Sequence, residues 1–141
     1  MFDWVSDSMQ KHIAVWELMA QLCLAFCLVS IMPCMASTAR CIFAIDNMSA
    51  EAASSKGLST SLGLDEMLAA WFHFQRVHAL QIDLRHIPGR WNHVADDLSR
   101  DRLPQEIHDS RRIQIPWAYL CSFSVTCRRP VDARFPPSFG G

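Results

Sequence analysis

The sequence predicts an α/β fold in which parallel strands are flanked by helices, with part of the sheet missing. Helical and strand-like segments alternate along the first hundred residues, a pattern typical of a parallel sheet covered by helices. Half of the 141 residues are hydrophobic and 19% are charged, which suits a single globular core. Only two segments have the pattern of strands, however, and two parallel strands cannot cover their own edges. We therefore expect an incomplete α/β domain.

The first half of the chain predicts two helices around one strand. Residues 12–32 are rich in Ala, Leu and Met, and Pro33 is expected to end this helix. Residues 40–47 form a short apolar run that ends in two turn-forming residues, as in a strand buried on both faces. Residues 48–56 then predict a short helix that stops at Gly57.

The second half predicts a helix, a strand and a last short helix. Asp65 is expected to cap a helix that runs to about His78. Residues 80–87 alternate apolar and polar side chains, the period of a strand with one exposed face. Pro88-Gly89 predicts a turn, and Asn92 is expected to open the last helix.

These elements divide the chain into two regions. Residues 1–103 form the partial domain, and residues 104–141 form a largely irregular tail that contains several Pro and Arg residues. At most one local strand is expected in the tail, over residues 117–125. The chain start lacks the basic segment of a signal peptide, which favours an intracellular location, cytoplasmic or nuclear.

Charge and hydropathy leave two classes of partner open. The formal net charge of −1 gives no general attraction to nucleic acid, although most basic residues follow position 70 and would meet such a partner there. Residues 18–35 are apolar enough to approach the minimum length of a membrane span. A buried helix of an α/β domain has the same composition, so we expect no membrane.

Three carboxylates stand at positions that suggest chemistry. Glu17 lies in an otherwise apolar helix, Asp46 follows the apolar strand, and Asp96 lies in the last helix. Side chains at the carboxyl ends of parallel strands often form ligand sites, and carboxylate oxygens suit divalent cations. The alternative is that Glu17 and Asp96 are surface charges and that Asp46 only forms a turn.

Three stretches resemble one family. His-Ile-Pro-Gly-Arg-Trp-Asn-His-Val-Ala-Asp-Asp-Leu-Ser-Arg at 86–100 closely resembles the end of retroelement ribonuclease H domains. Residues 13–20 are similar to the family's first helix, and Asp-Asn-Met-Ser-Ala at 46–50 is similar to its strand-end motif. The resemblance covers roughly residues 11–102. It is strongest to domains joined to reverse transcriptases of long-terminal-repeat and tyrosine-recombinase-type retrotransposons.

The resemblance implies a metal-dependent endoribonuclease that cuts the RNA strand of RNA–DNA hybrids with two Mg²⁺ or Mn²⁺ ions. By motif position, Glu17, Asp46 and Asp96 would hold the metals, with Asp97 as the alternative if the helix register differs by one. His86 matches the family's mobile catalytic histidine, which lies near the attacking water or the departing product.

The resemblance further implies that three polar side chains touch the substrate backbone: Asn47, Ser49 and Asn92. In this reading the 2′-hydroxyl distinguishes RNA from DNA.

The chain also departs from the family. Family members begin with three antiparallel strands, and the first strand carries an Asp that bridges both metals, whereas only sixteen residues precede Glu17 here. We therefore expect an N-terminally truncated domain, weak or inactive alone, with the remainder of a reverse transcriptase polyprotein as a partner that completes it. The alternatives are a non-catalytic α/β module that binds nucleic acid or protein and a membrane-anchored small protein. The oligomeric state stays open.

Overall fold

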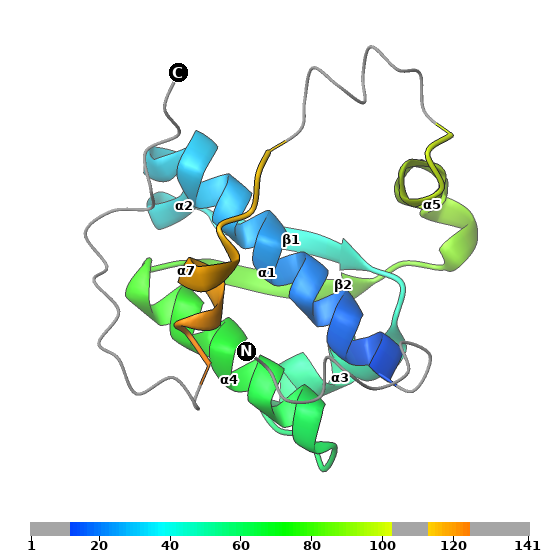
Figure 1. Ribbon diagram of the computed structural model, residues 1–141, viewed down its shortest axis with the longest axis horizontal. Coiled ribbons are helices and arrows are strands. Elements are labelled where there is room, and N and C mark those ends of the chain that lie inside the picture. Colours follow the sequence, from blue (N-terminus) through cyan, green and yellow to red (C-terminus); the bar gives the residue numbers. More distant parts are fainter. Residues whose placement is uncertain (1–11, 103–112, 125–141) are drawn as a thin grey trace.

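The computed structural model describes residues 12–102 and 113–124, and within them it has an α/β architecture (Figure 1). The elements run in the order α1 (Ile13–Ile31), α2 (Pro33–Thr38), β1 (Arg40–Ile45), α3 (Met48–Lys56), α4 (Leu62–Val77), β2 (Gln81–His86), the 3-10 turn η3 (Gly89–Trp91), α5 (His93–Ser99) and α7 (Trp117–Cys121). This mixed order with a two-stranded parallel sheet confirms the predicted α/β class.

The two strands pair in parallel, α1 and α3 pack against them, and α4 packs on α1 and reaches the face that carries Phe43 through Trp71 (Figure 1). On that face the strand side chains are buried: Phe43, Ile45, Ile82 and Leu84. The opposite face is open to solvent in the described part of the chain, and Ile42 there is 67% exposed. The expectation that the first strand is buried on both faces is therefore wrong. β2 has one exposed face, as its alternating sequence predicts.

The core lies between α1, α4 and the sheet. Leu18 and Phe26 from α1 and Trp71 and Phe74 from α4 are fully buried. Each such side chain stabilises the fold by about 1.5–3 kcal/mol relative to an exposed position. Phe43 of β1 reaches Trp71, with 6.4 Å between ring centroids, so the sheet and α4 share one aromatic contact. Helix α1 owes its apolar sequence to this position.

Helix α1 also meets the length and hydropathy that a membrane-spanning helix needs. A core helix of a soluble protein meets the same criteria. Its sequence alone therefore does not separate these two environments.

Two glutamines cap the outer edges of the sheet. The N–H of Ile87 donates to the carbonyl of Ile45 at 2.8 Å, so the backbone groups of Ile45 point toward β2 and those of Ala44 point to the outer edge. Gln21 Nε2 of α1 donates to the Ala44 carbonyl at 3.1 Å. At the other edge, the N–H of Ile82 donates to Gln75 Oε1 of α4 at 3.0 Å. Each covering helix thus satisfies one outward-pointing backbone group.

Helix α4 begins earlier than predicted. Ser61 is its N-cap, and Asp65 lies in the first turn instead of capping it. An acidic residue in the first turn is favourable there because it faces the positive end of the helix dipole. The predicted stop of α3 at Gly57 is confirmed, since this residue adopts a left-handed conformation with φ of 71°.

Two local expectations differ from the structure. Pro33 ends α1 and also starts α2, because its fixed φ suits the first position of a helix. The strand predicted over residues 117–125 is wrong in its described part, where α7 forms instead. Leu120 and Phe123, three residues apart, are both buried, and helical spacing places them on one side.

Replacing Gln75 by Leu should destabilise the fold, because the N–H of Ile82 would lose its partner in a buried position. We expect a loss of about 1–3 kcal/mol in the free energy of unfolding, measured by urea denaturation. The control is Gln114→Leu, since Gln114 is exposed. Equal stability of the two variants would show that Gln75 does not stabilise the strand edge.

Candidate functional site

The carboxyl groups of Glu17 and Asp46 meet at the carboxyl end of the sheet. Asp46 directly follows β1, and Glu17 lies in the second turn of α1, four residues before the Gln21 that binds the same strand. The two side chains lie close enough for the charge of Asp46 to act on Glu17. Burial, and then the negative charge of Asp46, raise the pKa of Glu17 from 4.5 to about 7. Glu17 thus keeps its proton up to about neutral pH.

Asn92 and His86 lie at the same end of the sheet. Asn92 Nδ2 donates to Asp46 Oδ2 at 3.1 Å, which fastens the start of α5 to the end of β1. His86 is the last residue of β2 and pairs in register with Ile45, the residue before Asp46. The parallel strands therefore bring four of the residues singled out by sequence, Glu17, Asp46, His86 and Asn92, to one edge.

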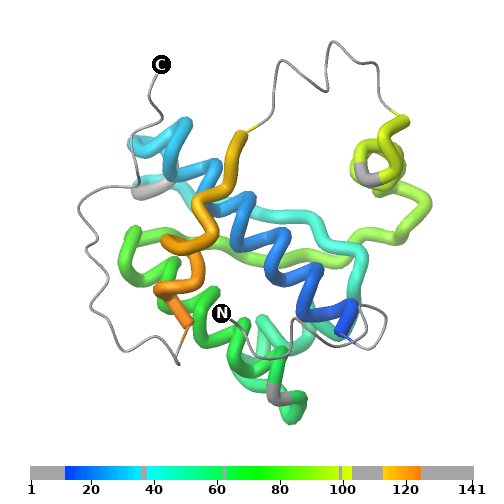
Figure 2. The backbone as a smooth tube through the Cα atoms, in the orientation of Figure 1, coloured from blue at the N-terminus to red at the C-terminus, as the bar shows by residue number. Residues whose placement is uncertain are grey.

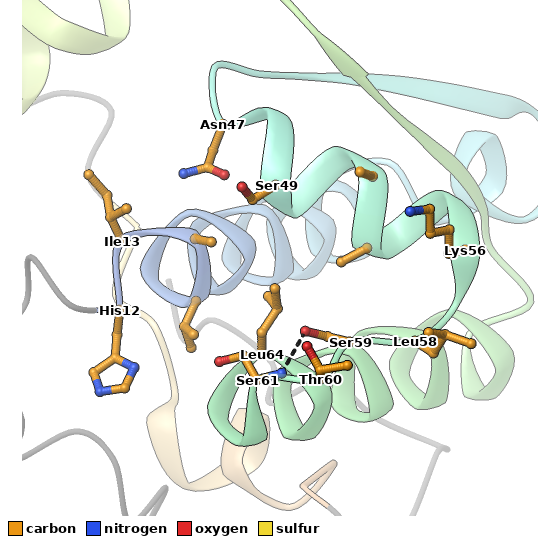
Figure 3. A pocket seen from close by; sticks show the side chains of 14 residues that line it. His12, Ile13, Asn47, Ser49, Lys56, Leu58, Ser59, Thr60, Ser61 and Leu64 are labelled. Atoms are coloured by element: carbon orange, nitrogen blue, oxygen red, sulfur yellow. Dashed lines mark hydrogen bonds between the residues drawn. The ribbon is translucent and has the colours of Figure 1, made fainter.

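Asn47 and Ser49 begin helix α3 beside this pair. Asn47 Oδ1 accepts a hydrogen bond from the N–H of Ala50 at 3.0 Å, so Asn47 caps the helix. Its Nδ2 stays on the outer side of that cap, because an amide offers donors and an acceptor on separate atoms. Both residues line the cavity shown in Figure 3.

The third predicted ligand, Asp96, does not join the pair. Its carboxylate lies 3.0 Å from Arg100 of the same helix, and both side chains are about half exposed. The alternative ligand, Asp97, lies 3.6 Å from Arg102. Figure 2 shows α5 set apart from α1 and α4, beyond the end of the sheet. No cluster of three or more His, Cys, Asp or Glu side chains that suits a metal forms within residues 12–102 and 113–124.

A cavity of about 530 Å³ opens next to Asn47 (Figure 3). The first residues of α1 and α4 line it, together with one side of α3 along its length and the loop that joins α3 to α4. The polar side chains on its wall are His12, Asn47, Ser49, Lys56, Ser59, Thr60 and Ser61. Ser59 Oγ accepts from the N–H of Ser61 at 3.1 Å, drawn as a dashed line in Figure 3.

The wall of this cavity holds a lysine and several hydroxyl groups but no carboxylate. Together with the positive ends of helix dipoles, such a wall favours an anion. The sequence analysis missed Lys56 and Ser59–Ser61. The cluster of small polar residues after Gly57 was the available signal, but only the tertiary fold brings this loop, α3 and the start of α1 together.

The paired carboxylates fit a divalent cation. Two carboxyl groups held in contact repel each other when both ionise, and a cation bound between them would remove this cost. Their hard oxygen atoms match Mg²⁺ or Mn²⁺. Glu17 and Asp46 would therefore hold such an ion, and binding would release the proton of Glu17.

In comparisons with protein-family models, curated protein sequences and solved structures, nothing matches this chain.

The raised pKa of Glu17 makes stability depend on pH. The folded chain holds this proton more tightly than the unfolded chain does, so its contribution to the free energy of unfolding is full below about pH 4.5 and decreases as the pH rises toward about 7. In the Glu17→Gln variant, this part of the pH dependence should vanish, and the variant should be more stable than the parent chain at pH 8. Thermal melts from pH 4 to 8 measure both effects.

The matched control for this titration is Asp65→Asn, because Asp65 is an exposed carboxylate of α4. Its stability should run parallel to the parent curve, slightly lower because the interaction of Asp65 with the helix dipole is lost. If the Glu17→Gln curve runs parallel to that of the parent over the whole range, the carboxyl pair does not carry the pH dependence.

Proposed function

We propose that this chain is part of a retroelement ribonuclease H domain, which hydrolyses the RNA strand of RNA–DNA hybrids once its sheet is completed. The observation that carries the proposal is the contact of Glu17 with Asp46 at the carboxyl end of a parallel sheet. In the motifs of that family these two positions are metal ligands. Their meeting is what a metal-dependent nuclease requires, and a purely structural role would not favour two adjacent carboxylates.

Asp96 completes the ligand set when a cation is present. Its pair with Arg100 joins two half-exposed side chains, and such surface pairs contribute only about 0–1 kcal/mol. Asn92, one turn before Asp96, is already bound to Asp46. A small rotation of α5 about this bond would bring Asp96 toward the pair, and attraction to the cation outweighs the weak pair with Arg100.

The chemistry follows from the residues at this edge. Two bound metal ions would activate a water molecule and stabilise the leaving 3′ oxygen of the RNA strand. Glu17, Asp46 and Asp96 would hold these ions, and Asn92 orients Asp46. His86, at the end of the neighbouring strand, stands where a proton or the departing product would pass.

The cavity beside Asn47 suits the backbone of the hybrid. Lys56 supplies a positive charge, and the hydroxyl groups of Ser59–Ser61 and Ser49 supply donors for a phosphate. Asn47 lies between this cavity and Asp46, so a phosphate bound in the cavity would place a neighbouring part of the hybrid near the carboxylates. Because the overall net charge of −1 gives no general attraction to nucleic acid, this local site is the main anchor for the hybrid.

Full activity requires a further strand at the outer edge of β1. Among the described residues, no donor reaches the buried Oε1 of Gln21, although its Nε2 binds Ala44 at that edge. An added strand would offer a backbone N–H there and would extend the sheet. In the family, such a strand carries the remaining metal-binding Asp. The remainder of a reverse transcriptase polyprotein is the proposed source.

A second candidate function is a non-catalytic α/β module that binds nucleic acid. The pairing of Asp96 with Arg100, away from Glu17 and Asp46, favours it. This module would bind a hybrid through the cavity without cutting it. The two candidates share the cavity and differ in cleavage.

Cleavage of a labelled RNA–DNA hybrid in Mg²⁺ or Mn²⁺ tests the proposal. We expect little cleavage by the chain alone and clear cleavage by the chain fused to the three N-terminal strands of an intact family member. In the fusion, Asp46→Asn should reduce the rate at least about 100-fold, because even residues that only support metal ligands contribute 10–100-fold.

The control variant is Asp65→Asn in the fusion, which should cut normally because Asp65 is exposed on α4. Cleavage by the chain alone that is lost in Asp46→Asn would show that three carboxylates suffice and would disprove the need for a further strand. A folded fusion that binds but never cuts would refute the nuclease and leave the binding module.

The cavity is tested by hybrid binding without cleavage, measured in Ca²⁺ by fluorescence anisotropy. Lys56→Glu should weaken binding about tenfold at low salt and should lower the salt dependence by about one phosphate contact. Arg85→Glu is the control, since Arg85 is exposed on the strand β2 and lies outside this cavity. Equal losses in both variants would mean that only the net charge matters and that the cavity is not the phosphate site.

A further inference from the structure

Residues 113–124, which we call the clasp, lie against the core far from the carboxylate pair. In Figure 1 the clasp, which contains α7 and is drawn in orange, lies beside α1 and α4. Leu120 and Phe123 are almost completely buried. A helix as short as α7 is not stable alone, so its conformation depends on this docking.

Aromatic contacts hold the clasp to both helices. Tyr119 meets Phe26 of α1 edge-on, with 5.9 Å between ring centroids. Phe123 meets Phe74 of α4 in the same way at 5.0 Å. Each such pair contributes about 0.5–1.5 kcal/mol beyond the burial of its surface. The clasp therefore closes the outer side of the groove between α1 and α4.

Two histidines, His73 of α4 and His78 at its C-cap, make polar contacts with the clasp. His78 Nε2 forms a hydrogen bond of 2.7 Å with the hydroxyl of Tyr119. His73 Nδ1 lies 3.4 Å from the carbonyl of Phe123. At the far end of the clasp, Ser124 Oγ donates to Glu66 Oε1 at 2.7 Å.

Of the residues in these contacts, His78 has a side chain that can take up a proton as the pH falls below neutral. Three aromatic rings surround its imidazole: Phe74 at 4.5 Å, Phe123 at 6.1 Å and Tyr119 at 6.3 Å between centroids. A protonated imidazole in this apolar setting loses most of its hydration. Because the clasp forms two of these three rings, its departure would return water to His78.

We propose that the clasp is a pH-dependent latch, closed while His78 is neutral and opened when His78 takes up a proton. Opening exposes the apolar surfaces of Phe26 and Phe74 that Tyr119 and Phe123 cover. The latch rests on contacts of α7 with α4 and is independent of the proposed nuclease.

The surroundings of His78 favour its neutral form when the clasp is closed. Burial lowers the pKa of His78 below its usual 6.5. Burial also raises the pKa of Tyr119, so the phenol stays protonated in the same range. Of the other titratable or charged groups of α4, His73 and Glu66 contact the clasp at Phe123 and Ser124, and Arg76 lies in the last turn of the helix.

The sign of the effect follows from the lowered pKa. The open state binds the proton more tightly than the closed state does. The stability of the closed clasp is therefore complete above about pH 6.5 and falls as the pH drops through the lower pKa of the closed state. Closure should weaken about tenfold for each unit by which the two pKa values differ.

Tyr119 is the only tyrosine of the chain, so fluorotyrosine labelling gives one ¹⁹F resonance that reports on the clasp. We expect this resonance to move between pH 7.5 and 5 toward its position in Phe123→Ala, the open reference. His78→Gln keeps a hydrogen-bonding side chain that does not titrate, and its resonance should stay at the closed position. His93→Gln is the control, because His93 is exposed on α5, and it should follow the parent chain.

A resonance that does not move, or that moves with the same midpoint in His78→Gln, would overturn the proposal. Amide hydrogen exchange of residues 113–124 in the parent chain gives a second measurement that needs no variant. Their protection, corrected for the intrinsic pH dependence, should fall about tenfold or more at pH 5 while that of α1 is kept. Unchanged protection of the clasp would also overturn the latch.

Discussion

The packing of α1 across the sheet is the interaction on which the other features depend. One side of this helix buries Leu18, Leu22 and Phe26 between the strands and α4. The same packing fixes the rotation of the helix and its position along its own axis. It therefore places Glu17 against Asp46 and, one turn later, Gln21 against Ala44. The carboxylate contact and the cap on the strand edge are thus two results of one apolar interface.

The contact between Glu17 and Asp46 opposes folding when both groups are charged. Partial burial and the repulsion from Asp46 raise the pKa of Glu17. The fold tolerates this cost in the free energy of folding because burial of the apolar side of α1 contributes far more. Carboxyl groups held together in this way are typical of functional sites, where a cation or a proton satisfies them. A cavity lined by Lys56 opens beside Asn47, the residue after Asp46, so groups of opposite charge lie in neighbouring sites.

The two-stranded sheet is stabilised mainly by its helices. Gln21 and Gln75 each satisfy one outward-pointing backbone group, which limits the exposure that a sheet this small would otherwise have at its edges. The unsatisfied Oε1 of Gln21 lies near the outer edge of β1, and Ile42 is exposed on the face of the sheet opposite to Phe43 and Ile45. The clasp closes the opposite, helical side of the core.

The sequence by itself determined the order of elements and several of their ends, because periodicity and residues such as Gly57 act over a few neighbours. It also singled out Glu17 and Asp46 through motif spacing. Only the tertiary structure decided that these two meet while Asp96 pairs with Arg100, since the path of α5 depends on long-range contacts. The cavity and the docking of α7 likewise required distant segments to meet, and local patterns carry no information about such contacts.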